Sequence, residues 1–305
     1  MPRKNYILPN FFATVHGELP FKPTNDYMFK KLFLKNQKAL KVFLAALLGV
    51  PPSSIHKIQI LNPELLPEQI FNKQCILDLH LLVNDKHRVN LEMQNKNENT
   101  WTDRSVIYLL RSFDSLLEGD NYDKLTPTTQ VGILNYDLFP EENEFYAHYK
   151  MINVKNHKIY NDKVELCVLN LNQINLATEE DIARGIDLWA RFFKATTWED
   201  LKMLAEEKMI FAECAHTMHN ILKNQEEYLY LQARIEGERV WAAKEQEVQE
   251  AQAERDVAVS ERDAAVSERD AAVSERDVAV SERDAAVSEL TRLRTLLEAN
   301  GINTD

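Results

Sequence analysis

The stretch ILDLHLLVNDKHRVNLEMQ, at residues 76–94, has the pattern of a β-hairpin. Residues 76–83 and 88–94 are rich in Leu, Val and Ile, and the polar break Asn84-Asp85-Lys86 between them is typical of a turn. A three-residue loop centred on Asp85 pairs residues whose numbers add up to about 170. The sequence therefore predicts that Asp78 lies opposite Glu92 on neighbouring strands.

This register brings acidic side chains together on one face of the hairpin. Side chains alternate along a strand, so Asn90, Glu92 and Gln94 point the same way. Carboxylates directly opposite each other, with Cβ atoms roughly 4.5 to 5.5 Å apart, destabilise a sheet unless a positive charge lies between them. Mg²⁺ prefers oxygen ligands, so Asp78 and Glu92 are candidate ligands, and phosphate oxygens would complete the shell. This is the layout of a metal-dependent nuclease site.

A plainer explanation of the same residues stays open. Asp78 would then be a charge that protects an edge strand, and Glu92 and Gln94 would be polar residues on a solvent-facing side. Against this, Asp78 sits inside an otherwise apolar run, where an unpaired buried carboxylate is unfavourable.

The residues also resemble a known family. An Asp followed fourteen residues later by Glu-x-Gln is similar to the core of the PD-(D/E)XK nuclease superfamily, and the closer resemblance is to its branch of recombination-promoting nucleases and transposases. The resemblance covers about residues 20–175. The segments that carry it are PTNDYMFKKLF (23–33), ILNPEL (60–65), NKQCILDLH (72–80), VNLEMQ (89–94), RSVIYLLRSF (104–113) and GDNYDKLTPTTQVGILNYDLF (119–139).

The resemblance implies an α/β restriction-endonuclease-like fold, with a mixed sheet flanked by helices. It also implies Mg²⁺-dependent cleavage of DNA, with Mn²⁺ as an alternative ion, in recombination or transposition. Asp78 and Glu92 would be metal ligands, and Gln94 would take the place of the superfamily's lysine. Glutamine can orient water or phosphate but carries no charge, so Lys96, Lys73 or water on the metal are alternatives for the water-activating group.

Asp26 is the candidate for a third acid, which the superfamily often places on its first helix. Thr24-Asn25-Asp26 directly precedes a helical pattern that contains Phe29 and Phe33, so Asp26 is equally well explained as a residue that caps the helix or complements its dipole. For Lys30 and Lys31, which follow on this helix, we expect a solvated face rather than phosphate contacts.

A further helix is predicted from Trp101 to Leu117, with Val106, Leu109, Leu110 and Phe113 at helical spacing. Arg104 and Tyr108 lie on one face of it, where they are candidates to contact phosphate or DNA. The alternative is a salt bridge from Arg104 to Asp103 or Asp114, with Tyr108 at the edge of the core. Further strands are predicted at 130–136 and 164–171.

The histidines and cysteines show no metal-binding spacing. His80, His148 and His157 are expected to be isolated polar residues. Only Cys75, Cys167 and Cys214 occur, without a Cys-x-x-Cys motif, so the pattern indicates neither a disulfide framework nor a zinc ribbon. We expect a cytoplasmic, reducing environment, no signal peptide and no membrane span.

The charge is unevenly distributed along the 305 residues, whose net charge is −12. Residues 1–130 carry 16 Lys and Arg against 13 Asp and Glu, residues 131–225 carry 10 against 15, and residues 226–305 carry 10 against 20. The proposed catalytic part is thus mildly basic, which permits DNA as a partner.

Three parts are predicted: a nuclease-like domain at 1–175, a helical region packed on it at 176–240 and a helical tail at 241–300. In the tail, Glu-Arg-Asp-(Ala/Val)-Ala-Val-Ser begins at residues 254, 261, 268, 275 and 282. Consecutive apolar residues fit a coiled coil poorly, so we expect a long, weakly specified helix. The leucines from Leu290 to Leu297 are candidates to form a homo-oligomer, to dock on another protein or only to cap the tail.

The sequence as a whole favours a Mg²⁺-dependent DNA endonuclease. Two other functions stay open: a DNA-binding or regulatory protein with an inactive nuclease core, and a scaffold that acts through its tail.

Overall fold

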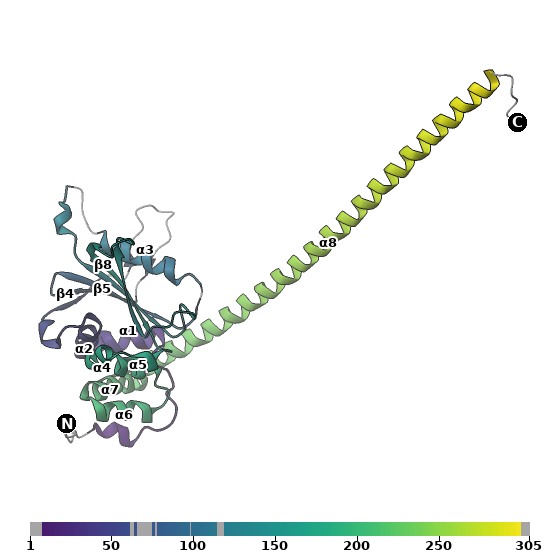
Figure 1. Ribbon diagram of the computed structural model, residues 1–305. Coiled ribbons are helices and arrows are strands. Elements are labelled where there is room, and N and C mark those ends of the chain that lie inside the picture. The colour runs from purple at the N-terminus through teal and green to yellow at the C-terminus, as the bar shows by residue number, and fades with distance from the viewer. Residues whose placement is uncertain are drawn as a thin grey trace. The chain divides into compact units, whose positions relative to one another are not determined.

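The computed structural model describes residues 8–61, 64–65, 75–76, 78–97, 99–114 and 119–299. The chain forms two compact units, residues 1–231 and residues 232–305. The first unit contains a six-stranded mixed sheet with helices on both faces, as Figure 1 shows. The predicted mixed sheet with flanking helices and a long C-terminal helix is therefore confirmed.

The six strands of the sheet lie in the order β1-β4-β5-β6-β8-β7. The pairs β5–β6 and β6–β8 are parallel, and the other pairs are antiparallel. The strand bounds are β1 (Ile58–Ile60), β4 (Leu79–Val83), β5 (His87–Gln94), β6 (Thr128–Leu134), β7 (Tyr146–Ile152) and β8 (Ile159–Asn170). The two predicted strands at 130–136 and 164–171 are β6 and β8, with different ends.

The hairpin of β4 and β5 has the predicted register. Its five pairs run from Leu79 with Leu91 to Val83 with His87, and the numbers of each pair add up to 170. Asn84 and Asp85 in the turn have φ angles of 52° and 57°, which Asn and Asp tolerate better than most residues. The side chain of Asn84 holds this turn in place, because it accepts hydrogen bonds from the backbone N–H groups of His56 and Lys57.

The prediction of one continuous strand over residues 76–83 is wrong. Cys75–Ile76 forms a short strand, β3, which pairs with β2 (Glu64–Leu65) in a separate two-stranded sheet. β4 begins only at Leu79, so Asp78 lies in a bend one residue before the ladder.

Helix α3 (Trp101–Phe113) connects the parallel strands β5 and β6 and packs against β6 and β8. Trp101 lies directly over Gly132: a Cβ atom at residue 132 would be 2.1 Å from the Cζ2 atom of Trp101. Trp101 forms a buried cluster with Leu134, Ala147 and Val168. The glycine is therefore required where the helix meets the sheet.

The remaining helices of the first unit lie on the other side of the sheet (Figure 1). Asn25 and Asn36 cap α1 and α2, since their side chains accept hydrogen bonds from the backbone N–H groups of Met28 and Ala39. Packed aromatic rings, including Phe33, Phe43, Trp189 and Phe193, join these helices. The bounds are α1 (Asp26–Lys35), α2 (Gln37–Leu48), α4 (Glu179–Arg184), α5 (Ile186–Lys194), α6 (Trp198–Glu207) and α7 (Met209–Lys223). Short 3₁₀ helices are η1 (Asn10–Ala13), η2 (Pro52–Ser54), η3 (Tyr122–Lys124) and η4 (Ile174–Leu176).

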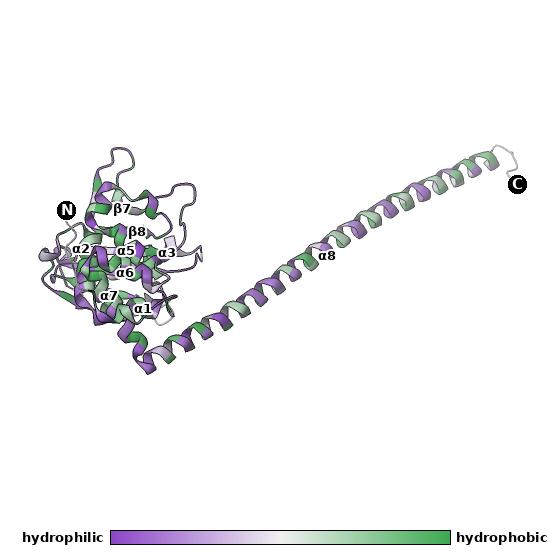
Figure 2. Cartoon of the chain, turned by 90° about the horizontal axis from the view of Figure 1, so that it is seen from below, coloured by the Kyte–Doolittle hydropathy of each residue, from purple (hydrophilic) through white to green (hydrophobic). Residues whose placement is uncertain are grey.

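Helix α8 (Gln225–Ala299) begins on the first unit and contains the repeats of the second. At its start, Leu231 is fully buried, and Glu227 accepts hydrogen bonds from Tyr27, Lys31 and Lys35 of α1. Figure 2 shows hydrophobic and hydrophilic residues mixed along the rest of α8. Among the described residues, no helix combines the length and apolar composition that a membrane crossing needs.

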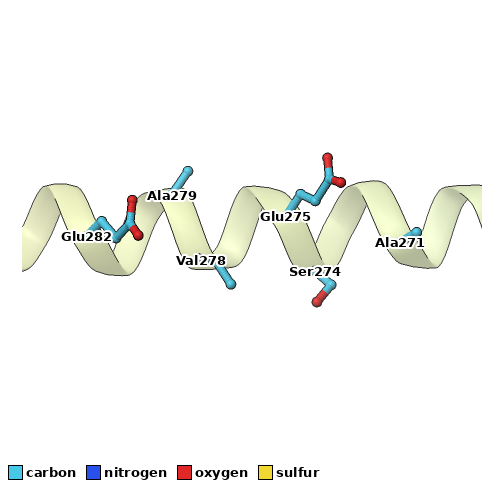
Figure 3. A pocket seen from close by; sticks show the side chains of 6 residues that line it. All are labelled: Ala271, Ser274, Glu275, Val278, Ala279 and Glu282. Atoms are coloured by element: carbon cyan, nitrogen blue, oxygen red, sulfur yellow. The ribbon is translucent and has the colours of Figure 1, made fainter.

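A shallow hollow on α8 lies beside side chains of a single helix, as Figure 3 shows. Its lining residues are Ala271, Ser274, Glu275, Val278, Ala279 and Glu282. No other element of the described residues encloses it, so it is ordinary helix surface rather than a binding site.

Candidate active site

The carboxylate of Asp78 is held on both of its oxygens. Oδ2 accepts a hydrogen bond of 2.8 Å from the backbone N–H of Met93, and Oδ1 lies 3.0 Å from the Nζ atom of Lys30. Only 12 % of the side chain is exposed. The bend before β4 and the hydrogen bond to β5 therefore direct this carboxylate toward the end of β5, where Glu92 lies.

Glu92 is buried in the middle of the sheet, on the strand between β4 and β6. Its Oε1 atom accepts a hydrogen bond of 3.3 Å from the Nε2 atom of Gln94 and lies 3.7 Å from the NH2 atom of Arg104. Its Oε2 atom is buried and has no hydrogen-bond partner among the described residues. A buried carboxylate oxygen without a partner is unfavourable, so this atom is suited to a further positive ligand.

The two carboxyl groups influence each other electrostatically. Burial, and then the negative charge of Asp26, raise the pKa of Asp78 to about 6. Burial, and then the negative charge of Asp78, raise the pKa of Glu92 to about 8, although Arg104 opposes this shift. Strongly perturbed acids that share a site are a common feature of catalytic and metal-binding centres.

Lys30 connects the first helix to this pair of acids. Its Nζ atom lies 3.2 Å from Oδ1 of Asp26 as well as 3.0 Å from Oδ1 of Asp78. Burial opposes the charge of Lys30, but the two carboxylates raise its pKa above the ordinary value. The expectation that Lys30 belongs to a solvated helix face is therefore wrong, and Lys30 is a site residue that the sequence analysis missed.

Asp26 reaches the site from the first turn of α1. The residue that caps this helix is Asn25, so the alternative in which Asp26 is the cap is wrong. Asp26 still lies where a negative charge favours a helix N-terminus. Its carboxylate shares Lys30 with Asp78, which places all three charged groups at one end of β5.

Arg104 covers the site from α3. Its guanidinium carbon lies 5.4 Å from the ring of Trp101 and 5.9 Å from the ring of Tyr108. Arg104 also forms an ion pair with Glu92, at 3.7 Å. Arg104 and Tyr108 thus share one face of α3, and Arg104 reaches Glu92 of the sheet from it.

The face of α3 that packs on the sheet is more polar than the helical spacing of its apolar residues suggested. Ser105 and Ser112 are buried, whereas Val106 and Leu110 are about half exposed, at 47 % and 48 %. Beneath Ser112 lie three polar side chains on neighbouring strands: His80 on β4, Asn90 on β5 and Gln130 on β6. Asn90 donates a hydrogen bond to Gln130, and the Ser112 hydroxyl is hydrogen-bonded to both His80 and Asn90. His80 is therefore not the isolated residue that we expected.

Lys96 and Lys73 are the lysines that the sequence offers as alternatives for the water-activating group. Lys96 follows β5 and is exposed to solvent. Lys73 lies outside the described residues. Among the described lysines, Lys30 is therefore the one whose ammonium group contacts a carboxylate of the candidate site.

The donors available at this site are suited to a hard divalent cation. Asp78 and Glu92 supply carboxylate oxygens, and within the described part of the chain Oε2 of Glu92 accepts no hydrogen bond that a cation would have to replace. Mg²⁺ and Mn²⁺ take oxygen ligands of this kind. Three acids face two basic groups here, Lys30 and Arg104, so the set leaves formal negative charge for a cation to neutralise.

A family model described as PD-(D/E)XK nuclease family transposase matches residues 23–247. The match starts at the first of the motifs quoted above, covers the whole sheet and extends into α8. No curated protein and no solved structure matches the chain.

Proposed function

This chain belongs to the PD-(D/E)XK nuclease family transposases, and on that basis we propose that it is an endonuclease that hydrolyses DNA phosphodiester bonds with a divalent cation. Membership in the family supports a nuclease-type enzyme. The substrate, the ion and the residue roles are our inference. The family description names transposases, and this supports a role in recombination or in the movement of DNA elements.

The observation that carries the proposal is the pair of buried acids at the end of β5. Asp78 is fixed by Met93 and Lys30, and Glu92 keeps a buried oxygen without a hydrogen-bond partner among the described residues. Two ionised acids this close are unfavourable, as their raised pKa values indicate, and a cation between them would stabilise the ionised pair. We infer that Asp78 and Glu92 hold Mg²⁺, or Mn²⁺ in its place, and that Asp26 is a weaker ligand candidate.

When bound, such an ion neutralises charge on a phosphate and makes water a stronger nucleophile. The side chains around the acids then have distinct tasks. Gln94 donates a hydrogen bond to Glu92 and so orients this carboxylate. Met93 and Lys30 fix the two oxygens of Asp78, which keeps the acid from rotating away from the site.

Positive charge for the phosphate comes from two elements outside the hairpin. Gln94 occupies the place of the superfamily's lysine and brings no charge. Lys30 from α1 and Arg104 from α3 are the basic groups that contact the acids, at 3.0 Å and 3.7 Å. We infer that they stabilise the negative charge that grows on the phosphate during cleavage, with Tyr108 supporting Arg104.

A plasmid-nicking assay tests this function. The full chain is incubated with supercoiled plasmid and Mg²⁺ or Mn²⁺, with EDTA as the metal-free control. We expect metal-dependent nicking that Asp78→Asn and Glu92→Gln each reduce by at least roughly a hundredfold, because even partners in the outer shell of a metal site contribute about 10- to 100-fold. Glu275→Gln, which changes an exposed acid of the tail, is the matched control and should nick like the wild type.

Nicking that survives both substitutions would show a contaminating nuclease or another active site. If the wild type does not nick with either ion while the chain is folded, the activity is absent, and the DNA-binding or regulatory alternative replaces the proposal.

A further inference from the structure

Three side chains with metal-binding atoms meet at the edge of the sheet, away from the acids of the candidate active site. His148 belongs to the edge strand β7, and Glu165 and Cys167 belong to its neighbour β8. The Nδ1 atom of His148 lies 3.2 Å from Oε1 of Glu165 and 3.5 Å from Sγ of Cys167. All three ligand atoms lie within 4.8 Å of one another.

The strand register explains why these residues meet. His148 is directly opposite Cys167, and Glu165 lies two residues before Cys167, so that all three side chains share one face. Val168, next to Cys167, belongs instead to the cluster under α3. The three residues therefore lie on the opposite face of the sheet from Trp101 and α3.

The two distances from Nδ1 of His148, 3.2 Å to Glu165 and 3.5 Å to Cys167, are close to those expected around a tetrahedral zinc ion. With bonds of about 2.3 Å to sulfur and about 2.0 to 2.2 Å to nitrogen and oxygen, neighbouring ligand atoms are roughly 3.4 to 3.6 Å apart. Cysteine, histidine and glutamate are all zinc ligands, and the thiolate disfavours Mg²⁺.

The surroundings of the three residues favour ligand binding on one side. Cys167 is 1 % exposed, while the side chain of His148 is 36 % exposed, so the cluster opens to solvent at the histidine. Tyr146 borders the cluster: its hydroxyl donates a hydrogen bond to the backbone carbonyl of Leu47 and is also within hydrogen-bonding reach of the Cys167 thiol. Lys150 lies 3.4 Å from Oε1 of Glu165 and is the one basic group in an ion pair with this cluster among the described residues.

We propose that His148, Glu165 and Cys167 bind a divalent cation of the zinc type, with a fourth position open to solvent. The ion would join β7 to β8 next to the irregular register after Lys150, where the edge strand is least regular. Its task would be to fix this edge of the sheet, separate from the chemistry proposed at Asp78 and Glu92. The expectation that His148 is isolated is wrong in either case, because it contacts both partners.

Cobalt absorption tests the site directly, because Co²⁺ substitutes for zinc and gives a near-ultraviolet charge-transfer band when a thiolate binds it. The full chain is titrated with Co²⁺ under a reductant that does not bind metal, in the presence of excess Mg²⁺. We expect one equivalent of Co²⁺ to produce the band, and Zn²⁺ to remove it by displacement. Cys167→Ser should abolish the band, and His148→Ala should weaken binding by at least roughly tenfold.

Matched controls distinguish this site from others. Cys214→Ala removes a buried cysteine on α7 and should keep the band, and Glu92→Gln should keep it as well because it leaves the thiolate ligand intact. Lys150→Ala removes a competing charge beside Glu165 and should tighten Co²⁺ binding roughly three- to tenfold. Circular dichroism checks that each variant is folded.

Absence of the band in the folded wild type would overturn the proposal, as would a band that persists in Cys167→Ser. Loss of the band in Cys214→Ala would assign it to another cysteine. Weaker binding in Lys150→Ala would remove Glu165 from the ligand set. None of these results depends on nuclease activity, so failure here and failure of the proposed endonuclease can be told apart.

Discussion

The two units of this chain place their acidic residues in opposite environments. The first unit holds the largely buried Asp78 beside its central hairpin and buries Glu92 on β5, and it surrounds both with Lys30 and Arg104. The second repeats Glu-Arg-Asp at every seventh residue of α8 and leaves these acids exposed. A buried acid is unfavourable unless something binds it, whereas an exposed acid is hydrated at little energetic expense.

The same contrast applies to packing. In the first unit, helices cover both faces of the sheet, and even one extra carbon atom has no room at Gly132. In α8, the valines of the repeats are 39 % to 60 % exposed, and a Cβ atom at Gly237 would meet no other atom within 4 Å. The first unit is thus specified by its contacts and the second by its local helix preference. Whether α8 associates with another chain stays a prediction.

The two glycines give the sharpest test of this difference. Gly132→Ala should destabilise the first unit by roughly 1 to 3 kcal/mol, because the new Cβ would lie 2.1 Å from Trp101 and the helix must shift. Gly237→Ala should instead stabilise α8 by about 0.5 to 1 kcal/mol, because alanine favours the helix interior. Chemical unfolding, followed by tryptophan fluorescence and by circular dichroism, measures both.

A second substitution serves as the control for the first glycine. Trp101→Leu removes the ring that Gly132→Ala would contact, so the double variant should lose less stability than the sum of the two single variants. Additive losses would show that the contact between Trp101 and Gly132 does not limit this position.

The hairpin could be predicted from the sequence because local rules govern it. Alternation with a period of two and a short polar turn were enough to give the register of all five pairs between β4 and β5. The break before Leu79 could not be predicted, because it depends on the pairing of Cys75–Ile76 with a different segment. Asp78 lies in that break, so its exact surroundings depend on tertiary structure.

The residues around the acids were harder to predict for the same reason. Lys30 is 48 residues before Asp78 in the sequence, and its spacing on α1 is that of an ordinary solvated lysine. On α3, the apolar spacing predicted a helix, but it did not show that Val106 and Leu110 are about half exposed while the serines face a polar row. Hydrophobic periodicity assumes an apolar partner surface, and this site does not provide one.

The buried acids should also make stability depend on pH. The pKa values of Asp78 and Glu92, about 6 and about 8, lie above the ordinary values of about 3.9 and about 4.3. Between these values the folded chain holds protons that the unfolded chain has released, so stability is lost as the pH rises. In the presence of EDTA, we expect the melting temperature of the first unit to fall between about pH 5 and pH 8.

Two substitutions test whether the pH dependence comes from these acids, one at Glu92 and one at an exposed acid of the tail. Glu92→Gln carries no titrating proton and should flatten the decline, whereas Glu275→Gln should leave it unchanged. A divalent cation should also reduce the decline, because it stabilises the ionised pair. A melting temperature that rises over this pH range would contradict the burial of two interacting acids.

The smallest effect is expected from the ion pairs of the tail. The NH2 atom of Arg269 lies 2.8 Å from Asp270, its immediate neighbour, and both side chains are mostly exposed, at 70 % and 63 %. Arg262, Arg276 and Arg283 form the same adjacent pairs. Pairs of this kind contribute about 0 to 1 kcal/mol, so Arg269→Met should change the helix content of α8, followed by circular dichroism, by only a small amount. A large loss of helix would show that the repeat is held by its charges, and the contrast with the first unit would then fail. A small loss of helix would mean that the intrinsic helix preference of its residues, rather than its ion pairs, keeps the repeat helical. Each repeat would then contribute to the helix independently of the next.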